Sequence, residues 1–225
     1  MKSARRLSVS GLTIAAVLLL TGCAKEPSYD AIDFHYDYFP NLTGGFVEYQ
    51  VQEITHDAGT SDTLNYFMRE FVAESFIDGN GHTATRIERS IRFALTDDYE
   101  LVQVLEQKRT PTNAQRVEDN QRYVVMVFPL AEGETWDGNA YNVMDRWDYV
   151  AGPVAQPYQI GFYDFDETVR IDQRNNINLV EQQVAWEVYA RNVGLIQKHF
   201  KNLTFQNFQI TGSELYLSVI GFGSN

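Results

Sequence analysis

Asp78-Gly79-Asn80-Gly81 is a turn-forming tetrapeptide between two long stretches with strand character. Glycine and asparagine tolerate the positive φ angles of tight β-turns, so this sequence predicts a β-hairpin. An EF-hand loop is excluded, because the carboxylates and the terminal glutamate are not at the required spacing. Before the turn, residues 64–77 are apolar and aromatic. After it, one face of the return strand carries Ile87, Ile91, Phe93 and Leu95, and the other carries Arg86, Glu88, Ser90 and Arg92.

The same period of two recurs along most of the chain. Val47, Tyr49 and Val51 alternate with polar residues, which is typical of a half-buried strand. Residues 123–130 are apolar on both faces and predict a central strand that is covered on both sides. Further strands are predicted at residues 101–108, 168–171, 176–182, 184–190, 195–200, 204–210 and 215–222, with a turn at Asn175-Asn176.

Helices compete with this interpretation in two places. Val180, Val184 and Val188 fall at fourfold spacing, but the β-branched content and the following bend at residues 192–194 favour a strand. A short helix is predicted at residues 143–149, capped by Asn142. About ten strands with short connections predict an all-β, mainly antiparallel fold. We expect a single-domain β-meander that forms a curled sheet or a partly open barrel, with at most one short helix.

The N-terminus has the features of a bacterial lipoprotein signal. Positive residues at the start precede an apolar run over residues 11–20, which is too short for the about 20 residues that span a bilayer. Leu18-Leu19-Leu20-Thr21-Gly22-Cys23 then predicts cleavage between Gly22 and Cys23 and acylation of the Cys23 thiol. A plain secretory signal with a chance cysteine, or a buried core helix, is the alternative. The predicted organisation is a signal peptide at 1–22, a lipidated tether at 23–31 and a β domain at 32–225.

The charge and the tether restrict the partners. The chain has a formal charge of −12, and removing the three basic residues of the signal leaves 15 basic against 30 acidic side chains, or −15. This charge argues against binding to nucleic acid or to anionic lipid headgroups. Residues 24–30 reach only about 25 Å when extended, so the domain is expected close to its membrane. Ala24 stands where an aspartate often retains lipoproteins in the inner membrane, which predicts the outer membrane. Cys23 is the only cysteine, so disulfides are not expected.

Three sequence blocks carry a resemblance to known proteins. The first is Val127-Phe128-Pro129-Leu130 with Gly133, Trp136 and Gly138-Asn139-Ala140-Tyr141-Asn142. The second runs from Val188 to Ile196, and the third is Tyr38-Phe39-Pro40. Over most of residues 35–222 the chain resembles small, uncharacterised lipoproteins of Bacteroidetes-type bacteria. The resemblance implies a lipidated β domain in the envelope and carries over no catalytic residue. Asn192 replaces the usual glycine, and asparagine tolerates the left-handed conformation.

Candidate binding residues are few. Trp136 and Trp147, with nearby tyrosines, are candidates to stack on sugars, although core packing is the competing role. Asp164 and Asp166 share a face of an extended segment, as the acid and base of a glycosidase or a calcium site would, or as a solvated loop would. Asp33, His35 and Asp37 alternate along a predicted N-terminal strand and are considered as metal ligands or as a polar outer face.

Other chemistry has no support in the sequence. The chain lacks a G-x-S-x-G elbow, an H-E-x-x-H motif, a phosphate-binding glycine loop and a dinucleotide fingerprint, so no catalytic residue, metal or cofactor is predicted. We therefore expect a non-enzymatic binding or accessory module, held at the outer membrane by the lipid on Cys23. Its partner is expected to be an envelope protein, a lipid or a glycan. The alternatives are a carbohydrate hydrolase that uses Asp164 and Asp166, or a structural subunit of an outer-membrane complex.

Overall fold

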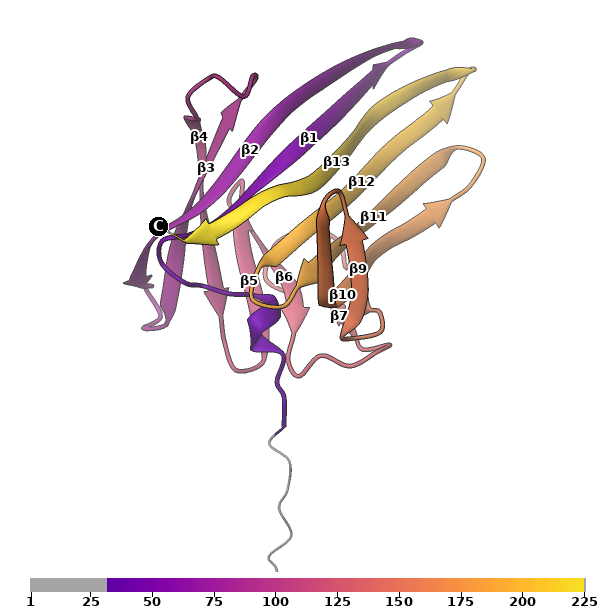
Figure 1. Cartoon of the computed structure of the whole chain (residues 1–225). Helices are drawn as coiled ribbons and strands as arrows, with labels where there is room; N and C mark the ends of the chain where they lie inside the picture. Colours follow the sequence, from indigo (N-terminus) through magenta and orange to yellow (C-terminus); the bar gives the residue numbers. More distant parts are fainter. Residues whose placement is uncertain (1–31, 225) are drawn as a thin grey trace, which may run out of the picture. The chain divides into compact units, whose positions relative to one another are not determined.

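The computed structural model describes residues 32–224 and confirms an all-β, antiparallel fold (Figure 1). Within this range, one short 3₁₀ turn, η1 (Tyr36–Tyr38), precedes thirteen strands of a single sheet. The strands are β1 (Gly45–Asp57), β2 (Thr60–Ile77), β3 (Thr83–Arg92), β4 (Glu100–Arg109), β5 (Asn113–Glu118), β6 (Gln121–Val127), β7 (Thr135–Asp137), β8 (Asp148–Ala151), β9 (Gln156–Ile160), β10 (Tyr163–Ile177), β11 (Glu181–Ala190), β12 (Gly194–Gln206) and β13 (Gln209–Ser224). No helix among the described residues is long and apolar enough to cross a membrane.

The sheet curls into a nearly closed barrel. Its strand order is β6-β5-β4-β3-β2-β1-β13-β12-β11-β10-β8-β7, with β9 paired to β10 outside this path. Most neighbours follow one another in the sequence, and the pairing of β1 with β13 joins the two halves of the meander. Tight turns allow this connectivity. Asp78 accepts the backbone N–H of Gly81, as the Asp-Gly-Asn-Gly sequence predicts for a hairpin turn.

The two ends of the strand order meet at a seam that strand pairing does not close. At this seam the backbone N–H of Val124 in β6 donates to the carbonyl of Gly138 just after β7, at 2.9 Å. The indole N–H of Trp136 donates to the Val124 carbonyl at 2.8 Å. Tyr38 and Phe39 are buried in the same apolar cluster. Trp136, Tyr38 and Phe39 therefore pack where strand pairing leaves the barrel open.

The prediction of a central strand at residues 123–130 is wrong in its position. The strand is β6, which ends at Val127 and lies at one end of the sheet order. Its residues are buried because the seam brings β7 alongside and because the N-terminal segment packs on them. A nearly closed barrel thus gives an end strand the apolar pattern of a central one.

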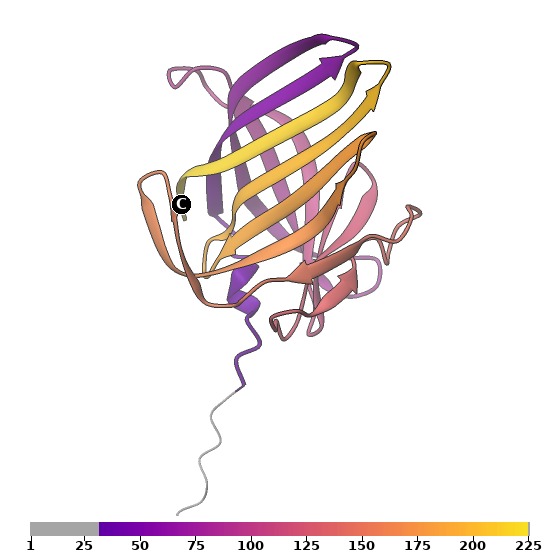
Figure 2. The same cartoon turned by 90° about the vertical axis from the view of Figure 1, so that its right-hand side faces the viewer.

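The barrel has two ends, which we name by the turns that they carry. The entry end holds η1 and the turns at residues 110–112 and 191–193. There Tyr36 donates its hydroxyl proton to the Pro111 carbonyl, and the backbone N–H of Asn192 donates to the Asp37 carbonyl. The far end holds the turns at residues 58–59, 119–120 and 207–208. Figure 2 shows the β1–β2, β12–β13 and β10–β11 hairpins extending together toward the far end.

One predicted turn and one predicted strand differ from the structure. Asn175 and Asn176 continue β10 and pair with β11, and the turn follows at Asn178. The Asn178 carboxamide oxygen accepts the N–H groups of Val180 and Glu181, a local bond that stabilises a turn. The predicted strand at 204–210 is split by a two-residue turn at Asn207 and Phe208, whose φ angles are 51° and 62°.

The predicted helix at residues 143–149 is wrong. This segment is a loop followed by β8. The Asp137 carboxylate accepts the backbone N–H of Trp147, and the Asn139 side chain donates to the Asp145 carbonyl. Backbone groups that a helix would pair internally are thus bound to side chains of the preceding turn.

Candidate functional site

Six charged side chains point into the barrel and form what we call the charged layer: Glu70, Arg89, Arg116, Glu118, Glu187 and Lys198. Strand register explains their proximity. Glu70 and Arg89 are paired residues of β2 and β3, and Glu187 and Lys198 are paired residues of β11 and β12. Arg116 and Glu118 lie two residues apart on β5, so their side chains share the inner face.

The layer is tightly ion-paired. Arg89 donates from Nε and Nη2 to Oε1 of Glu70, at 3.0 and 2.8 Å, and Arg116 also donates to this oxygen. Arg89 reaches Glu118 through Nη1. Lys198 lies 2.9 Å from Glu187, which also accepts the hydroxyl proton of Tyr189. Three carboxylates thus face three cations, and the layer as a whole is neutral.

The ionisation of the layer follows from this pairing. Burial alone would raise the pKa of the Glu70 carboxyl, but Arg116 and Arg89 lower that pKa to about 2. The same two cations lower the pKa of Glu118 against the effect of burial. Burial acts to lower the pKa of Lys198, whereas Glu187 and Glu118 raise it above its ordinary value. Glu70, Glu118 and Lys198 are therefore charged at neutral pH.

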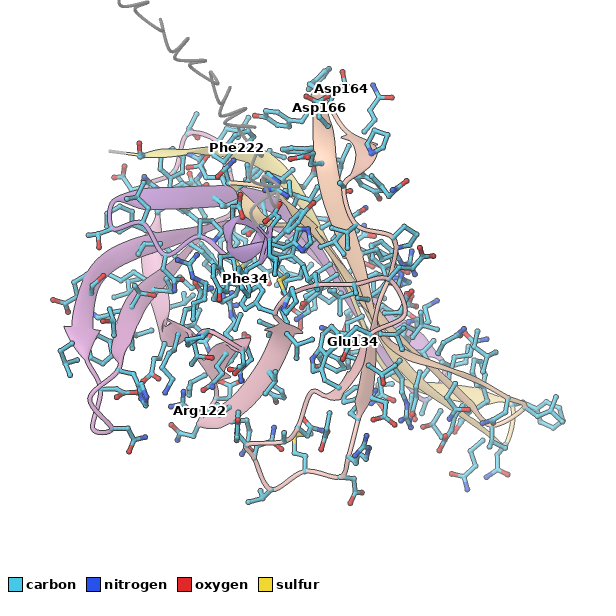
Figure 3. All side chains as sticks on the ribbon, turned by 90° about the horizontal axis from the view of Figure 1, so that it is seen from below. Phe34, Arg122, Glu134, Asp164, Asp166 and Phe222 are labelled. Atoms are coloured by element: carbon cyan, nitrogen blue, oxygen red, sulfur yellow. The ribbon has the colours of Figure 1, made fainter. Side chains whose placement is uncertain are left out.

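A cavity of about 430 Å³ opens on the entry side of the layer, and we call it the entry cavity. Glu70 and Arg116 form its polar floor. Its walls are mainly apolar and come from the N-terminal segment and from both halves of the meander: Phe39, Leu42, Phe46, Val72, Ile87, Leu195 and Phe222. Leu42 is 67% exposed and Phe222 is 40% exposed, so the mouth has an apolar rim. Figure 3 views the molecule from this end and labels Phe222 and Phe34.

Two arginines fix the N-terminal segment beside this mouth. Arg191, in the β11–β12 turn, donates to Asp33 and Asp37 at 2.7 Å each and also pairs with Glu167. Arg109 donates to the carbonyl oxygen of Tyr36 at 2.9 Å. The wall that this segment gives to the cavity is thereby held in place.

The N-terminal metal hypothesis fails on this geometry. Asp33, His35 and Asp37 do not lie on a strand, because His35 has a φ of 63° and residues 36–38 form η1. The two aspartates are occupied by the Arg191 guanidinium. Among the described residues, no group of three or more histidine, cysteine, aspartate or glutamate side chains could hold a metal ion.

A second cavity, of about 420 Å³, lies on the opposite side of the charged layer, and we call it the far chamber. Aromatic side chains line it together with the charged layer: Tyr66, Tyr123, Trp147, Tyr149, Tyr189 and Phe200. Lys198 borders it, which explains why 29% of this side chain is accessible although it lies inside the barrel. Trp147 and Phe200 also line an adjoining groove of about 250 Å³, the Trp147 groove.

The structure separates the four candidate ligand-binding residues. Trp136 is buried at the seam, where it packs against Tyr149 and donates to Val124. Trp147 instead lines the far chamber and the groove. Asp164 and Asp166 do share a face at the start of β10, as expected, but they are exposed (Figure 3) and line none of the cavities described above. Gly22 and Cys23 lie outside the described residues, so their cleavage and acylation stay predictions.

Sequence reasoning missed the charged layer. The sequence does contain one indication of this layer. Arg89 lies on the same face of its strand as Ile87 and Ile91, which is the apolar face. A charge on an apolar face indicates a buried ion pair or a polar interior. Its partner Glu70 stands in an apolar stretch, and nothing in the sequence links these two residues to Arg116.

One further polar cluster lies outside the barrel. Ser61 is 2.8 Å from Nδ1 of His56, and Nε2 of His56 is 3.0 Å from Glu214. The order resembles a catalytic triad, but Ser61 and His56 are simply paired residues of one hairpin. Glu214 is also bound by Lys201 and Tyr216. The cluster ties β1, β12 and β13 together, and we assign it a structural role.

Comparisons with known proteins add little. No family model and no curated protein matches the chain. A protein from Bacteroides fragilis, described as exported and as having a YmcC-like fold, aligns at 11% identity over 81% of this chain and 98% of its own, with a TM-score of 0.38. A protein from Parabacteroides distasonis, described as a lipoprotein, aligns at 13% identity over 85% and 100%, with a TM-score of 0.36. Both TM-scores are below 0.5, so neither protein indicates a function for this chain.

Proposed function

We propose that this chain is a lipid-anchored protein of the outer membrane and that its entry cavity binds the apolar chain of an envelope lipid. The observation that carries the proposal is the cavity itself. Its volume of about 430 Å³ falls within the range of about 300–1,000 Å³ that is typical of small-molecule sites. Its walls are mainly aliphatic and aromatic, and its charged groups, Glu70 and Arg116, lie at the floor.

The position of the mouth supports a lipid as the ligand. The described chain begins at the entry end, beside the apolar rim. Asp33 lies ten positions after Cys23, a stretch that reaches at most about 35 Å. If Cys23 is acylated, the mouth lies within that distance of the bilayer. A lipid chain can then enter the cavity after only a short path through water.

The charged floor limits how deep an apolar chain enters. Glu70 and Arg116 satisfy one another, and separating them inside the barrel costs several kcal/mol. An apolar chain has nothing to offer either charge, so it stops at the layer. The entry cavity is therefore a closed-ended site for one short apolar segment rather than a passage through the barrel.

The test is photo-crosslinking in membranes. Membranes that contain the full chain are incubated with a palmitic acid that bears a diazirine, illuminated, and assayed for labelled protein. Val72→Trp fills the cavity and is expected to reduce labelling about tenfold, equivalent to about 1.4 kcal/mol of binding free energy. Leu42→Arg places a charge at the mouth without disturbing the core and is expected to act in the same direction.

The matched control is Val102→Trp, which adds the same bulk at an exposed position of β4. It is expected to label as the wild type does. Equal labelling of the wild type, Val72→Trp and Leu42→Arg would contradict a lipid in the entry cavity.

A further inference from the structure

We infer that the far chamber and the Trp147 groove form a second site, for a neutral oligosaccharide. This site is separate from the entry cavity and does not depend on the lipid proposal. The chamber and the groove share Trp147 and Phe200, so they adjoin each other at these two side chains. Two adjoining hollows of about 420 and 250 Å³ suit a chain of several sugar units rather than a single compact ligand.

Aromatic side chains supply the first element of recognition. Sugar rings present patches of C–H groups, which pack on aromatic faces, and hydroxyl groups, which need hydrogen bonds. Four tyrosines and Trp147 line the far chamber, whereas the walls of the entry cavity are mostly aliphatic and phenylalanine side chains. Tyrosine and tryptophan combine an apolar ring with a polar group and therefore suit an amphipathic ligand.

Polar groups supply the second element. Gln173 borders the chamber, while Gln183 and Asn202 border the groove, so neutral donors and acceptors occur along the whole surface. The indole N–H of Trp147 is buried and has no acceptor among the described residues. A buried donor without an acceptor costs about 1–3 kcal/mol.

The charges that line the site do not favour an acidic ligand. The charged layer is neutral, and the exposed Asp119 adds one negative charge to the chamber lining. In the groove, Arg146 and Lys201 are paired with Asp148 and Glu214, and Asp145 balances the charge of Arg174. A carboxylated or sulfated sugar would therefore gain no net electrostatic attraction from the site. Arg174, in the groove, is held by the Gln183 side chain at 2.8 and 3.0 Å and lies over the Trp147 ring, so it orients the tryptophan.

The test uses 5-fluorotryptophan in the full protein, purified from membranes and reconstituted in lipid nanodiscs. The chain has three tryptophans and so gives three ¹⁹F resonances, which single Trp→Phe variants assign. Maltohexaose, cellohexaose and mannohexaose are titrated, with hexagalacturonic acid as the acidic comparator. The Trp147 resonance is expected to shift saturably with at least one neutral hexasaccharide and not with hexagalacturonic acid.

Trp136, at the seam, and Trp186, on the outer face, serve as internal controls. Trp147→Phe is expected to weaken binding at least tenfold, as measured by calorimetry, whereas Trp186→Phe leaves it within twofold. A Trp147 resonance that none of the three neutral sugars moves would overturn the inference. So would a shift with hexagalacturonic acid alone, or a shift confined to Trp186. Each of these outcomes leaves the lipid proposal for the entry cavity untouched.

Discussion

Glu70 on β2 and Arg89 on β3 face each other inside the barrel, with Oε1 of the carboxylate 2.8 Å from Nη2 of the guanidinium. The same oxygen accepts a hydrogen bond from Arg116 on β5. One carboxylate thus pairs with two buried cations. It also divides the interior into an apolar cavity at the entry end and an aromatic, polar chamber at the far end.

Removal of this carboxylate is expected to be costly. Glu70→Gln leaves Arg89 and Arg116 with only Glu118 as a charged partner. Breaking a buried ion pair by removing one partner destabilises proteins by about 3–5 kcal/mol. Urea unfolding followed by circular dichroism is expected to show a loss of this size. Glu100→Gln, on an exposed position of β4, is the control and should change the free energy of unfolding by less than about 0.5 kcal/mol.

The layer also predicts how stability depends on pH. The pKa of Glu70 is about 2 in the folded protein, below its ordinary value of 4.5. A carboxyl group whose pKa is lowered by folding stabilises the folded state fully at pH values above its unfolded-state pKa. This stabilisation is lost as the pH falls through its folded-state pKa. We therefore expect the free energy of unfolding to fall between about pH 4.5 and pH 2. Glu70→Gln should flatten this part of the curve, and an unchanged slope would contradict the assignment.

Gly138 is expected to be intolerant of a side chain. A Cβ atom there would lie 2.4 Å from the ring of Tyr149, and the Gly138 carbonyl accepts the hydrogen bond that joins β7 to β6. Gly138→Ala should cost about 1–3 kcal/mol through overpacking at the seam. Gly79→Ala is the matched control, because nothing lies within 4 Å of its Cβ position. If both variants unfold at the same urea concentration, the seam is not packed as described.

Arg191 is expected to hold the N-terminal segment on the barrel. Arg191→Ala frees Asp33, Asp37 and Glu167, and residues 33–38 should then exchange amide hydrogen faster, as measured by mass spectrometry. The core strands should be unaffected. Arg146→Ala removes an exposed pair with Asp148 and serves as the control. Unchanged exchange in Arg191→Ala would contradict this role and leave Arg109 and the buried Tyr38 and Phe39 to hold η1.

Cys23 is expected to determine where the protein resides. Cys23→Ser removes the only thiol that can be acylated and should move the protein from the membrane fraction to the soluble fraction. Fractionation followed by immunoblotting checks this. Retention of the variant in membranes would contradict the lipoprotein assignment and would remove the argument that places the mouth near a bilayer.

Alternation of apolar and polar residues correctly predicted the all-β class, because half-buried strands carry it directly in the sequence. The alternation did not predict that β6 lies at one end of the sheet, because the burial of β6 at the seam depends on β7 and on the N-terminal segment. Nor did it locate the turns at Asn178 and Asn207, because several asparagines nearby tolerate the same conformations. Trp147 was a candidate from its residue type alone. The charged layer was missed because its members come from distant strands and meet only when the sheet closes.

The most direct test of the central claim is to map where the diazirine-bearing palmitic acid attaches in native membranes. Peptide mass spectrometry is expected to place the label on residues that line the entry cavity, in the segments 39–47, 192–195 and 222–224 and at Val72 and Ile87. The hairpin tips at the far end carry exposed apolar residues, Leu179 and Phe208, and so provide an internal comparison. Labels confined to these tips would contradict a lipid site in the entry cavity.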